Sequence, residues 1–147
     1  MPLKHLLLLS SLAVLGFTAT ARANETWLTD LNAAKVQATQ ENKKLLLDFT
    51  GSDWCYYCKK LDAEVFATPE FQAYAKNYIL VRLDYPRHKE QPATEKAQNA
   101  ALGKQFNING YPTVILLDAT GQELKREEGY NPGSGPKAYL TDLDSKS

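Results

Sequence analysis

Three features of the 147-residue sequence predict an α/β fold in which a small mixed central β-sheet is flanked by helices. Short apolar runs alternate with segments of helical periodicity along most of the chain. The first two runs are separated by enough residues for intervening helices, so these two strands are expected to be parallel. A tight turn separates the last two runs, which predicts an antiparallel pair. Helices on both faces of such a sheet would bury its apolar side chains.

Residues 1–23 are expected to be a secretory signal peptide and not part of the fold. Lys4 supplies a positive start, residues 6–17 are mostly apolar, and residues 21–23 have the small-x-small pattern that a signal peptidase cleaves. An uncleaved membrane anchor is the alternative, but the apolar stretch is shorter than the roughly 20 residues that span a bilayer. With a predicted cut after Ala23, residues 24–147 would form a single domain.

The first half of this domain is predicted to contain a helix, a buried strand and a second helix. Residues 25–43 have helical periodicity, with apolar residues on one face (Leu28, Leu31, Ala34 and Ala38). Residues 44–50 form a short, mostly apolar run, which is typical of a strand buried on both faces. A turn follows, and Ser52 or Asp53 is expected to cap a helix over residues 55–67.

The second half is predicted to add three strands and three helices. Thr68 and Pro69 have the form of a helix start, with a cap followed by proline at the first position. Thr94 is a candidate cap for an alanine-rich helix. The predicted helices cover residues 69–77, 94–106 and 136–143, and the predicted strands cover residues 78–85, 113–117 and 122–127.

The charge balance argues against nucleic acid as a partner. Cleavage of the signal peptide would remove Lys4 and Arg22, leaving 15 basic residues against 17 acidic residues. This near-neutral balance, without basic clusters, lacks the positive footprint that binding to a phosphate backbone requires. It also gives no reason to expect adsorption to an anionic membrane surface.

Cys55 and Cys58 form a Cys-x-x-Cys motif where the first strand gives way to a helix. At a helix N-terminus, unpaired N–H groups and the helix dipole stabilise negative charge, which lowers the pKa of a thiol there. The second sulfur lies about one turn further on, close enough to close a disulfide. We therefore expect Cys55, with the more exposed sulfur, to attack a disulfide and Cys58 to resolve the mixed disulfide.

Two other readings of the cysteine pair are weaker. Zinc sites built on this motif need two further Cys or His ligands, and residues 24–147 offer only His88, which is expected to be a solvated loop residue. No metal is therefore predicted. A purely structural disulfide over so short a loop would remove little entropy from the unfolded chain. No cofactor is predicted other than the redox-active disulfide itself.

Two motifs resemble the landmarks of the thioredoxin superfamily. Residues 46–49 (Leu-Leu-Asp-Phe), followed by Asp53-Trp54-Cys55 and Cys58-Lys59, resemble the first strand and the active site of that family. Residues 110–113 (Gly-Tyr-Pro-Thr) resemble its cis-proline loop. The resemblance covers nearly all of the predicted domain and extends to secreted bacterial thioredoxin-like proteins, including the C-terminal domain of periplasmic electron-transfer reductases. It implies a thioredoxin-like fold.

The resemblance also implies roles for other residues. Pro112 would be cis and would place the backbone of Tyr111 beside the sulfurs to pair with an extended substrate; the alternative is an ordinary trans-proline. Asp48 would be a buried carboxylate that exchanges protons with Cys58, since burial raises the pKa of a carboxyl group. The alternative for Asp48 is a strand-end residue that reaches solvent. Arg82 falls where thioredoxins place a basic partner for this acid, or it points to solvent.

Trp54, Tyr56 and Tyr57 are expected to form the surface that substrates contact. Trp54 would cover one side of the disulfide. Tyr56 and Tyr57 replace the Gly-Pro pair of thioredoxin and the Pro-His pair of strongly oxidising relatives. Two neutral side chains add no positive charge, so we expect no extreme stabilisation of the thiolate. Residues 50–53 make this loop one residue longer than in thioredoxin.

The sequence thus predicts a periplasmic or secreted thiol–disulfide oxidoreductase that acts on protein thiols and disulfides, with the reducing direction preferred. A reductase in an oxidising compartment needs an electron source, and the resemblance implies a membrane-embedded donor. A monomer is favoured. The alternative is a peptide-binding module of the same fold, or an accessory of cytochrome maturation, with marginal redox turnover.

Overall fold

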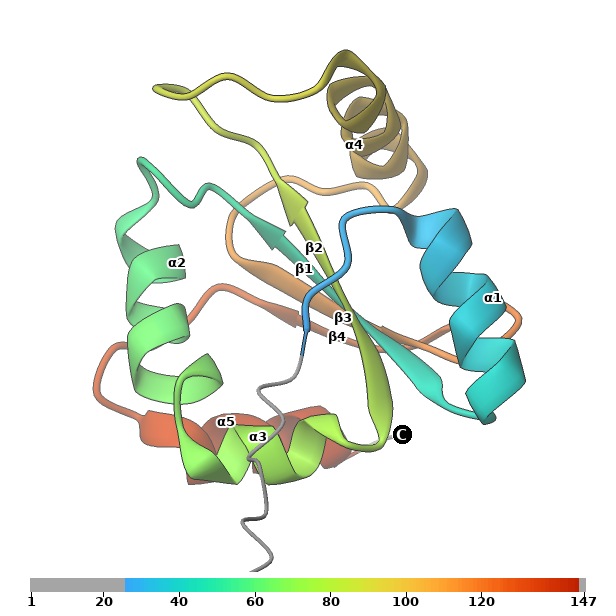
Figure 1. Cartoon of the computed structure of the whole chain (residues 1–147). Coiled ribbons are helices and arrows are strands. Elements are labelled where there is room, and N and C mark those ends of the chain that lie inside the picture. The colour runs from blue at the N-terminus through green and yellow to red at the C-terminus, as the bar shows by residue number, and fades with distance from the viewer. Residues whose placement is uncertain (1–25, 146–147) are drawn as a thin grey trace, which may run out of the picture.

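The computed structural model describes residues 26–145 (Figure 1). Four strands form one sheet in the order β2-β1-β3-β4. Their bounds are Lys44–Thr50 for β1, Tyr78–Asp84 for β2, Thr113–Leu117 for β3 and Glu123–Glu128 for β4. β1 is parallel to β2 and antiparallel to β3, which is antiparallel to β4. The predicted fold class is therefore confirmed, whereas the predicted signal peptide lies outside the described residues.

Helices cover both faces of the sheet, as Figure 1 shows. α1 (Leu31–Glu41) and α4 (Ala93–Gln105) pack on one face. The other face carries α2 (Tyr56–Leu61), the π-helical turn η1 (Asp62–Phe66), α3 (Pro69–Ala75) and α5 (Gly135–Asp144). Among the described residues, no helix combines the length and apolar character needed to cross a membrane.

Alternation along β1 divides its side chains between two hydrophobic clusters. Leu45, Leu47 and Phe49 point toward α1 and α4, whereas Leu46 points toward the opposite face. Because successive side chains of a strand point to opposite faces, Asp48 shares the side of Leu46. An acidic side chain is thus placed inside the cluster that α2, η1 and α5 cover.

The predicted helix over residues 25–43 begins too early. Leu28 instead forms a bridge with Val81, donating its N–H to the Leu80 carbonyl at 2.9 Å and accepting from the Arg82 N–H at 2.8 Å. The helix starts after Asp30, whose carboxylate accepts from the N–H groups of the next turn. The apolar spacing of Leu28 fitted a helix, but extended pairing beside β2 satisfies its backbone.

Three other local predictions need correction. The helix predicted over residues 55–67 is not uniform, because η1 replaces its last turn. Neither Ser52 nor Asp53 caps it, since both are engaged elsewhere and Cys55 is the N-cap. Thr94 does not cap α4, which begins at Ala93 with no side-chain cap. The remaining predicted boundaries differ from the observed ones by at most two residues.

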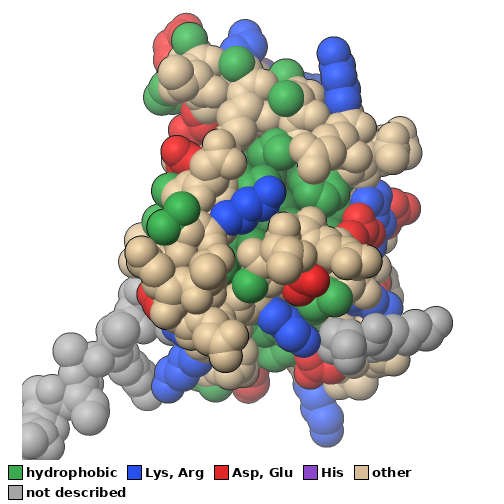
Figure 2. Space-filling model, turned by 90° about the vertical axis from the view of Figure 1, so that its right-hand side faces the viewer, with side chains coloured by type: hydrophobic (Ala, Val, Ile, Leu, Met, Phe, Trp, Pro, Cys, Tyr) green, Lys and Arg blue, Asp and Glu red, His purple; other side chains and the backbone are tan. Residues whose placement is uncertain are grey.

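Figure 2 shows the side of the molecule that α1 and α4 cover. Lys and Arg side chains are scattered there among acidic side chains and do not merge into one basic patch.

Candidate active site

Cys55 and Cys58 form a disulfide at the start of α2. Cys55 is the N-cap residue, and its sulfur accepts a hydrogen bond from the Cys58 N–H at 3.2 Å. An N–H that points at the first sulfur stabilises negative charge on it once the disulfide opens. The exposed fractions of the two residues are 5% and 2%. Cys55 is thus the more accessible of the pair, but it is less exposed than the sequence led us to expect.

The cis-proline loop lies against the first sulfur. The peptide bond between Tyr111 and Pro112 is cis, as expected from the resemblance. The carbonyl oxygen of Tyr111 lies 3.6 Å from the sulfur of Cys55. Pro112 is buried and Tyr111 is half-buried. Two segments far apart in the sequence are therefore brought together here, with a backbone carbonyl beside the reactive sulfur.

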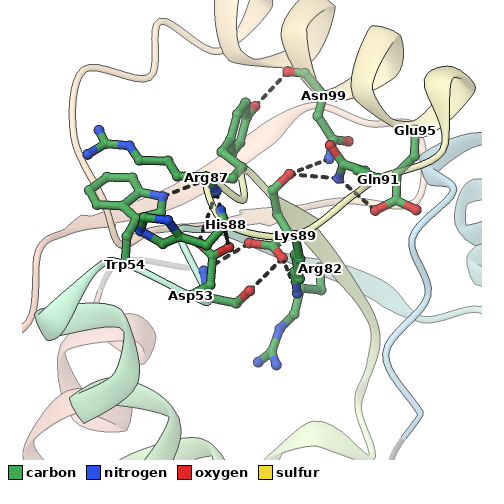
Figure 3. Close-up of polar contacts among 12 residues, drawn as sticks. Asp53, Trp54, Arg82, Arg87, His88, Lys89, Gln91, Glu95 and Asn99 are labelled. Atoms are coloured by element: carbon green, nitrogen blue, oxygen red, sulfur yellow. Dashed lines mark hydrogen bonds and ion pairs between the residues drawn. The ribbon is translucent and has the colours of Figure 1, made fainter.

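Trp54 is fixed in place by contacts on several sides (Figure 3). Its indole N–H donates to the Tyr85 carbonyl at 2.8 Å, and its ring meets that of Tyr111 edge-on at 5.7 Å. The guanidinium of Arg87 lies 3.5 Å from the centre of the indole ring. Gly51 lies so close to the ring that a Cβ there would fall 2.6 Å from the indole nitrogen. These contacts hold the Trp54 ring in one orientation next to Cys55.

Asp53 holds the segment that carries Arg87. Its carboxylate accepts hydrogen bonds from the backbone N–H of Arg87 at 3.0 Å and of His88 at 2.7 Å (Figure 3). These bonds lower the pKa of Asp53 against the opposing effect of desolvation. His88 itself is exposed, as predicted. A nearby pair strengthens the loop, because the Ser52 hydroxyl donates to Asp84 at 2.6 Å.

Asp48 is buried and shares one cation with another acid. Its side chain is 1% exposed, which rules out the solvent-reaching alternative. Arg82 places Nε 3.3 Å from Oδ2 of Asp48 and donates from Nη2 to Asp62 at 2.6 Å. Arg82 therefore does pair with this acid. Desolvation raises the pKa of Asp48 to about 7, opposed by the charge of Arg82 and assisted by the charges of Asp62 and Asp84.

Tyr56 and Tyr57 are the most exposed large aromatic residues in the described part of the chain, at 60% and 51%. Beyond Tyr57, a groove of about 860 Å³ runs along the end of β4 and the start of α5. Tyrosines form much of its wall (Tyr57, Tyr111, Tyr130 and Tyr139). This groove was not predicted, because helical and strand patterns do not show which loops meet.

Asp62 was also missed by the sequence analysis. It follows Leu61 in a segment predicted as regular helix, and its ion pair with Arg82 depends on the packing of η1 against β2. The one available signal was an acidic residue next to the buried stripe of a helix. Among the described residues, no group of three or more His, Cys, Asp or Glu side chains is placed to hold a metal ion.

The positions of the two cysteines and of the cis-proline loop define what the site can do chemically. Two sulfurs that open and close a bond at a helix N-terminus, beside a carbonyl that an extended peptide can pair with, perform thiol–disulfide exchange. The molecule is a thiol–disulfide oxidoreductase built on the thioredoxin fold.

Comparison with known proteins gives the family and its bacterial relatives. The chain belongs to the thioredoxin-like family, whose model for a thioredoxin-like domain matches residues 31–144. It is 33% identical over 126 residues to the disulfide bond reductase DsbH of Chlamydia pneumoniae. The alignment covers 85% of this chain and 74% of that protein. A solved structure of a DsbH oxidoreductase matches with a TM-score of 0.77 and 31% identity, over 92% of this chain and 93% of the other.

A second kind of relative is much longer. The chain is 29% identical over 128 residues to the thiol:disulfide interchange protein DsbD of Haemophilus ducreyi, covering 74% of this chain. It spans only 21% of the length of that protein. The shared part is therefore one domain of a larger molecule.

Proposed function

We propose that the protein reduces disulfide bonds of other proteins outside the cytoplasm, in the periplasm or as a secreted protein. The observation that carries the proposal is the Cys55–Cys58 disulfide with Cys55 at the N-cap of α2. The predicted signal peptide supports the location, and the similarity to a disulfide bond reductase supports the direction.

The residues between the cysteines also favour reduction. Tyr56 and Tyr57 are neutral and exposed, so no cation adjoins the first sulfur from within the motif. Strong oxidants of this family owe their potential to a stabilised thiolate. A thiolate that is stabilised mainly by the Cys58 N–H is a better reductant, because its oxidation costs less.

The proposed reaction transfers two electrons to the client and releases two client thiolates. The Cys55 thiolate attacks a client disulfide, forms a mixed disulfide and releases one client thiolate. The Cys58 thiol gives its proton to the Asp48 carboxylate, and the resulting thiolate attacks the sulfur of Cys55. The second client thiolate leaves as the Cys55–Cys58 disulfide closes. The client gains two electrons, which a reduced donor protein must return to the pair.

Clients would be recognised mainly through their backbone. An extended client strand would pair with Tyr111 beside Pro112, while Trp54, Tyr56 and Tyr57 provide the apolar surface on either side. The side chains that contact the client are then few, which suits an enzyme with several protein substrates. The electron donor would be a membrane-embedded protein, and the protein would work as a monomer.

The first test is the reduction potential of the cysteine pair, measured by equilibration with dithiothreitol or glutathione buffers. A value near that of thioredoxin, about −270 mV, would support a reductase. A value of about −120 mV would identify an oxidant instead. Since about 30 mV corresponds to a tenfold change in the equilibrium constant of this two-electron couple, the two outcomes are well separated.

Cysteine variants test the order of the steps. Cys58→Ser should trap client proteins on Cys55 as mixed disulfides that dithiothreitol releases. Cys55→Ser is the matched control and should trap none. If neither variant captured a client, while both retained affinity for partner peptides, the protein would be a binding module and not an exchange enzyme.

A further inference from the structure

Two buried polar atoms on the same side of the sheet have no hydrogen-bond partner among the described residues. One is Oδ1 of Asp48 and the other is the hydroxyl oxygen of Tyr139. The two residues are 1% and 6% exposed. Arg82 Nε also lacks an aligned hydrogen bond, but it lies within ion-pair distance of Oδ2, the other oxygen of Asp48. Burial of a polar atom without a partner is costly, so both atoms require an explanation.

The fold brings these two residues to the same cluster. Tyr139 projects from α5 into the hydrophobic cluster that contains Leu46 and Val114. Asp48 lies two residues from Leu46 on the same face of β1 and is the register partner of Val114 on β3. Burial and then the charge of Asp48 raise the pKa of Tyr139 well above its usual value. The shared cluster and the pairing of Asp48 with Val114 therefore place both residues in the buried layer between the sheet and α5.

We propose that Tyr139 is a positioning residue for the proton transfer at Asp48. Its hydroxyl donates to one buried water molecule, which in turn donates to Oδ1 of Asp48 and so gives both atoms a partner. Arg82 holds Oδ2, so the two donors together fix the carboxylate and stabilise its ionised form. The proposal rests on the function proposed above, in which Asp48 takes the proton of Cys58.

Other groups around Asp48 do not replace this donor. The charged and titratable groups that act on it are Arg82 and Asp84 from β2, Asp62 from η1 and, in the proposed reaction, the Cys58 thiol from α2. The carboxylates of Asp62 and Asp84 disfavour a second negative charge and offer no proton when ionised. After burial and the charge of Asp48, Glu127 of β4 and Tyr130 also raise the pKa of Tyr139. Of these neighbours, Tyr139 is a neutral donor whose hydroxyl has no other partner among the described residues.

Tyr130 provides a matched control in the same cluster. Its ring lies edge-on to that of Tyr139 at 5.7 Å, and its hydroxyl donates to Glu64 at 2.8 Å. Tyr130→Phe therefore removes one hydroxyl from the neighbouring ring without touching the proposed bond. Tyr139→Phe removes the proposed donor and keeps the ring that packs in the cluster.

The test is the carboxyl carbon resonance of Asp48, followed by NMR against pH in the oxidised protein and its two Phe variants. Loss of a hydrogen bond to the charged form should move the titration midpoint up by about one pH unit in Tyr139→Phe. Tyr130→Phe should leave the midpoint where it is. An unchanged or lowered midpoint in Tyr139→Phe, or an equal shift in both variants, would overturn the proposal.

A kinetic measurement links this shift to turnover. Reduced protein reacts with 5,5′-dithiobis(2-nitrobenzoate) and releases one nitrothiobenzoate as Cys55 attacks and a second as Cys58 closes the disulfide. The pH profile of the second release should move up with the Asp48 midpoint in Tyr139→Phe, and the first should not move. A second release with an unmoved profile would refute the positioning role.

Failure of the proposed function would be visible separately. If the unchanged protein released no second nitrothiobenzoate, the exchange mechanism would fail, whereas the NMR titration would still decide the hydrogen bond. If Tyr139→Phe did not fold, the tyrosine ring carbon that bears the hydroxyl of Tyr139 would be followed in the unchanged protein. It should shift through the Asp48 titration and lose this response in Asp48→Asn; a resonance that ignores Asp48 would count against the proposal.

Discussion

Replacement of Asp48 by Asn should stabilise the oxidised protein progressively as the pH rises. The carboxyl group is fully buried, and desolvation raises its pKa from 3.8 to about 7. In the unfolded chain the group ionises at its ordinary value, so between the two values the folded state binds more protons than the unfolded state. The stability contributed by the protonated group is present at low pH and is lost as the pH rises toward 7.

The magnitude follows from the shift. A difference of about three pKa units corresponds to about 4 kcal/mol of cost for ionised Asp48 in the folded state. About 1 kcal/mol of this cost is already present at about pH 4.5, and all of it at about pH 8. Asn carries no titratable group. The unfolding free energy of Asp48→Asn, minus that of the unchanged protein, should therefore increase by about 3 kcal/mol between these two pH values.

Urea unfolding of both oxidised proteins at the two pH values measures this difference, since the other carboxylates largely cancel. Asp142→Asn, which changes an exposed carboxylate on α5, serves as the control and should show no pH-dependent gain. A difference that stays constant with pH to within about 1 kcal/mol would mean that Asp48 is not held in a desolvated site. The constant part of the difference reports the lost contacts with Arg82 and carries no weight in this test.

Other contacts at the site give three further predictions. Gly51→Ala should lower the unfolding free energy by about 1–3 kcal/mol in urea, because the new methyl group collides with the Trp54 ring; an unchanged value would show that the ring moves freely. Arg87→Ala should change the fluorescence of Trp54 while costing under about 1 kcal/mol, since the cation is exposed; an identical spectrum would contradict the stacked geometry. Glu64→Ala should speed hydrogen exchange at the Gly133 N–H, whose 2.7 Å acceptor it removes; unchanged protection would show another acceptor.

The part of the fold that periodicity determines was predictable. The strand over Lys44–Thr50 was predicted with its observed bounds, because an apolar run of that length between polar segments is typical of a buried strand. The parallel and antiparallel pairings followed from the lengths of the connections. The start of α1 was not predictable in this way, since Leu28 fits a helical stripe and a bridge to Val81 equally well.

The site was predictable where chemistry is local and not where it depends on packing. Cys55 and Cys58 are three positions apart, so their disulfide at a helix N-terminus follows from the sequence. The approach of Tyr111 required a resemblance, because no local pattern joins it to a sulfur 56 residues away. Asp62 and Tyr139 belong to helices whose positions are set by side-chain packing. The sequence therefore did not predict that they lie on the same side of the sheet as Asp48.

The sharing of Arg82 between two acids explains why Asp48 is suited to the proposed role of proton acceptor. Arg82 carries one positive charge and contacts two carboxylates, Asp48 and Asp62. When both acids are ionised, this partly buried group has a net charge of about −1, whereas protonation of Asp48 leaves a balanced pair of Arg82 and Asp62. Proton uptake by Asp48 would thus restore local neutrality, and the Cys58 thiol is the proton source in the proposed reaction. A more complete neutralisation of Asp48 would lower its pKa and weaken it as a base, whereas burial with only a partial pairing to Arg82 leaves that pKa at about 7.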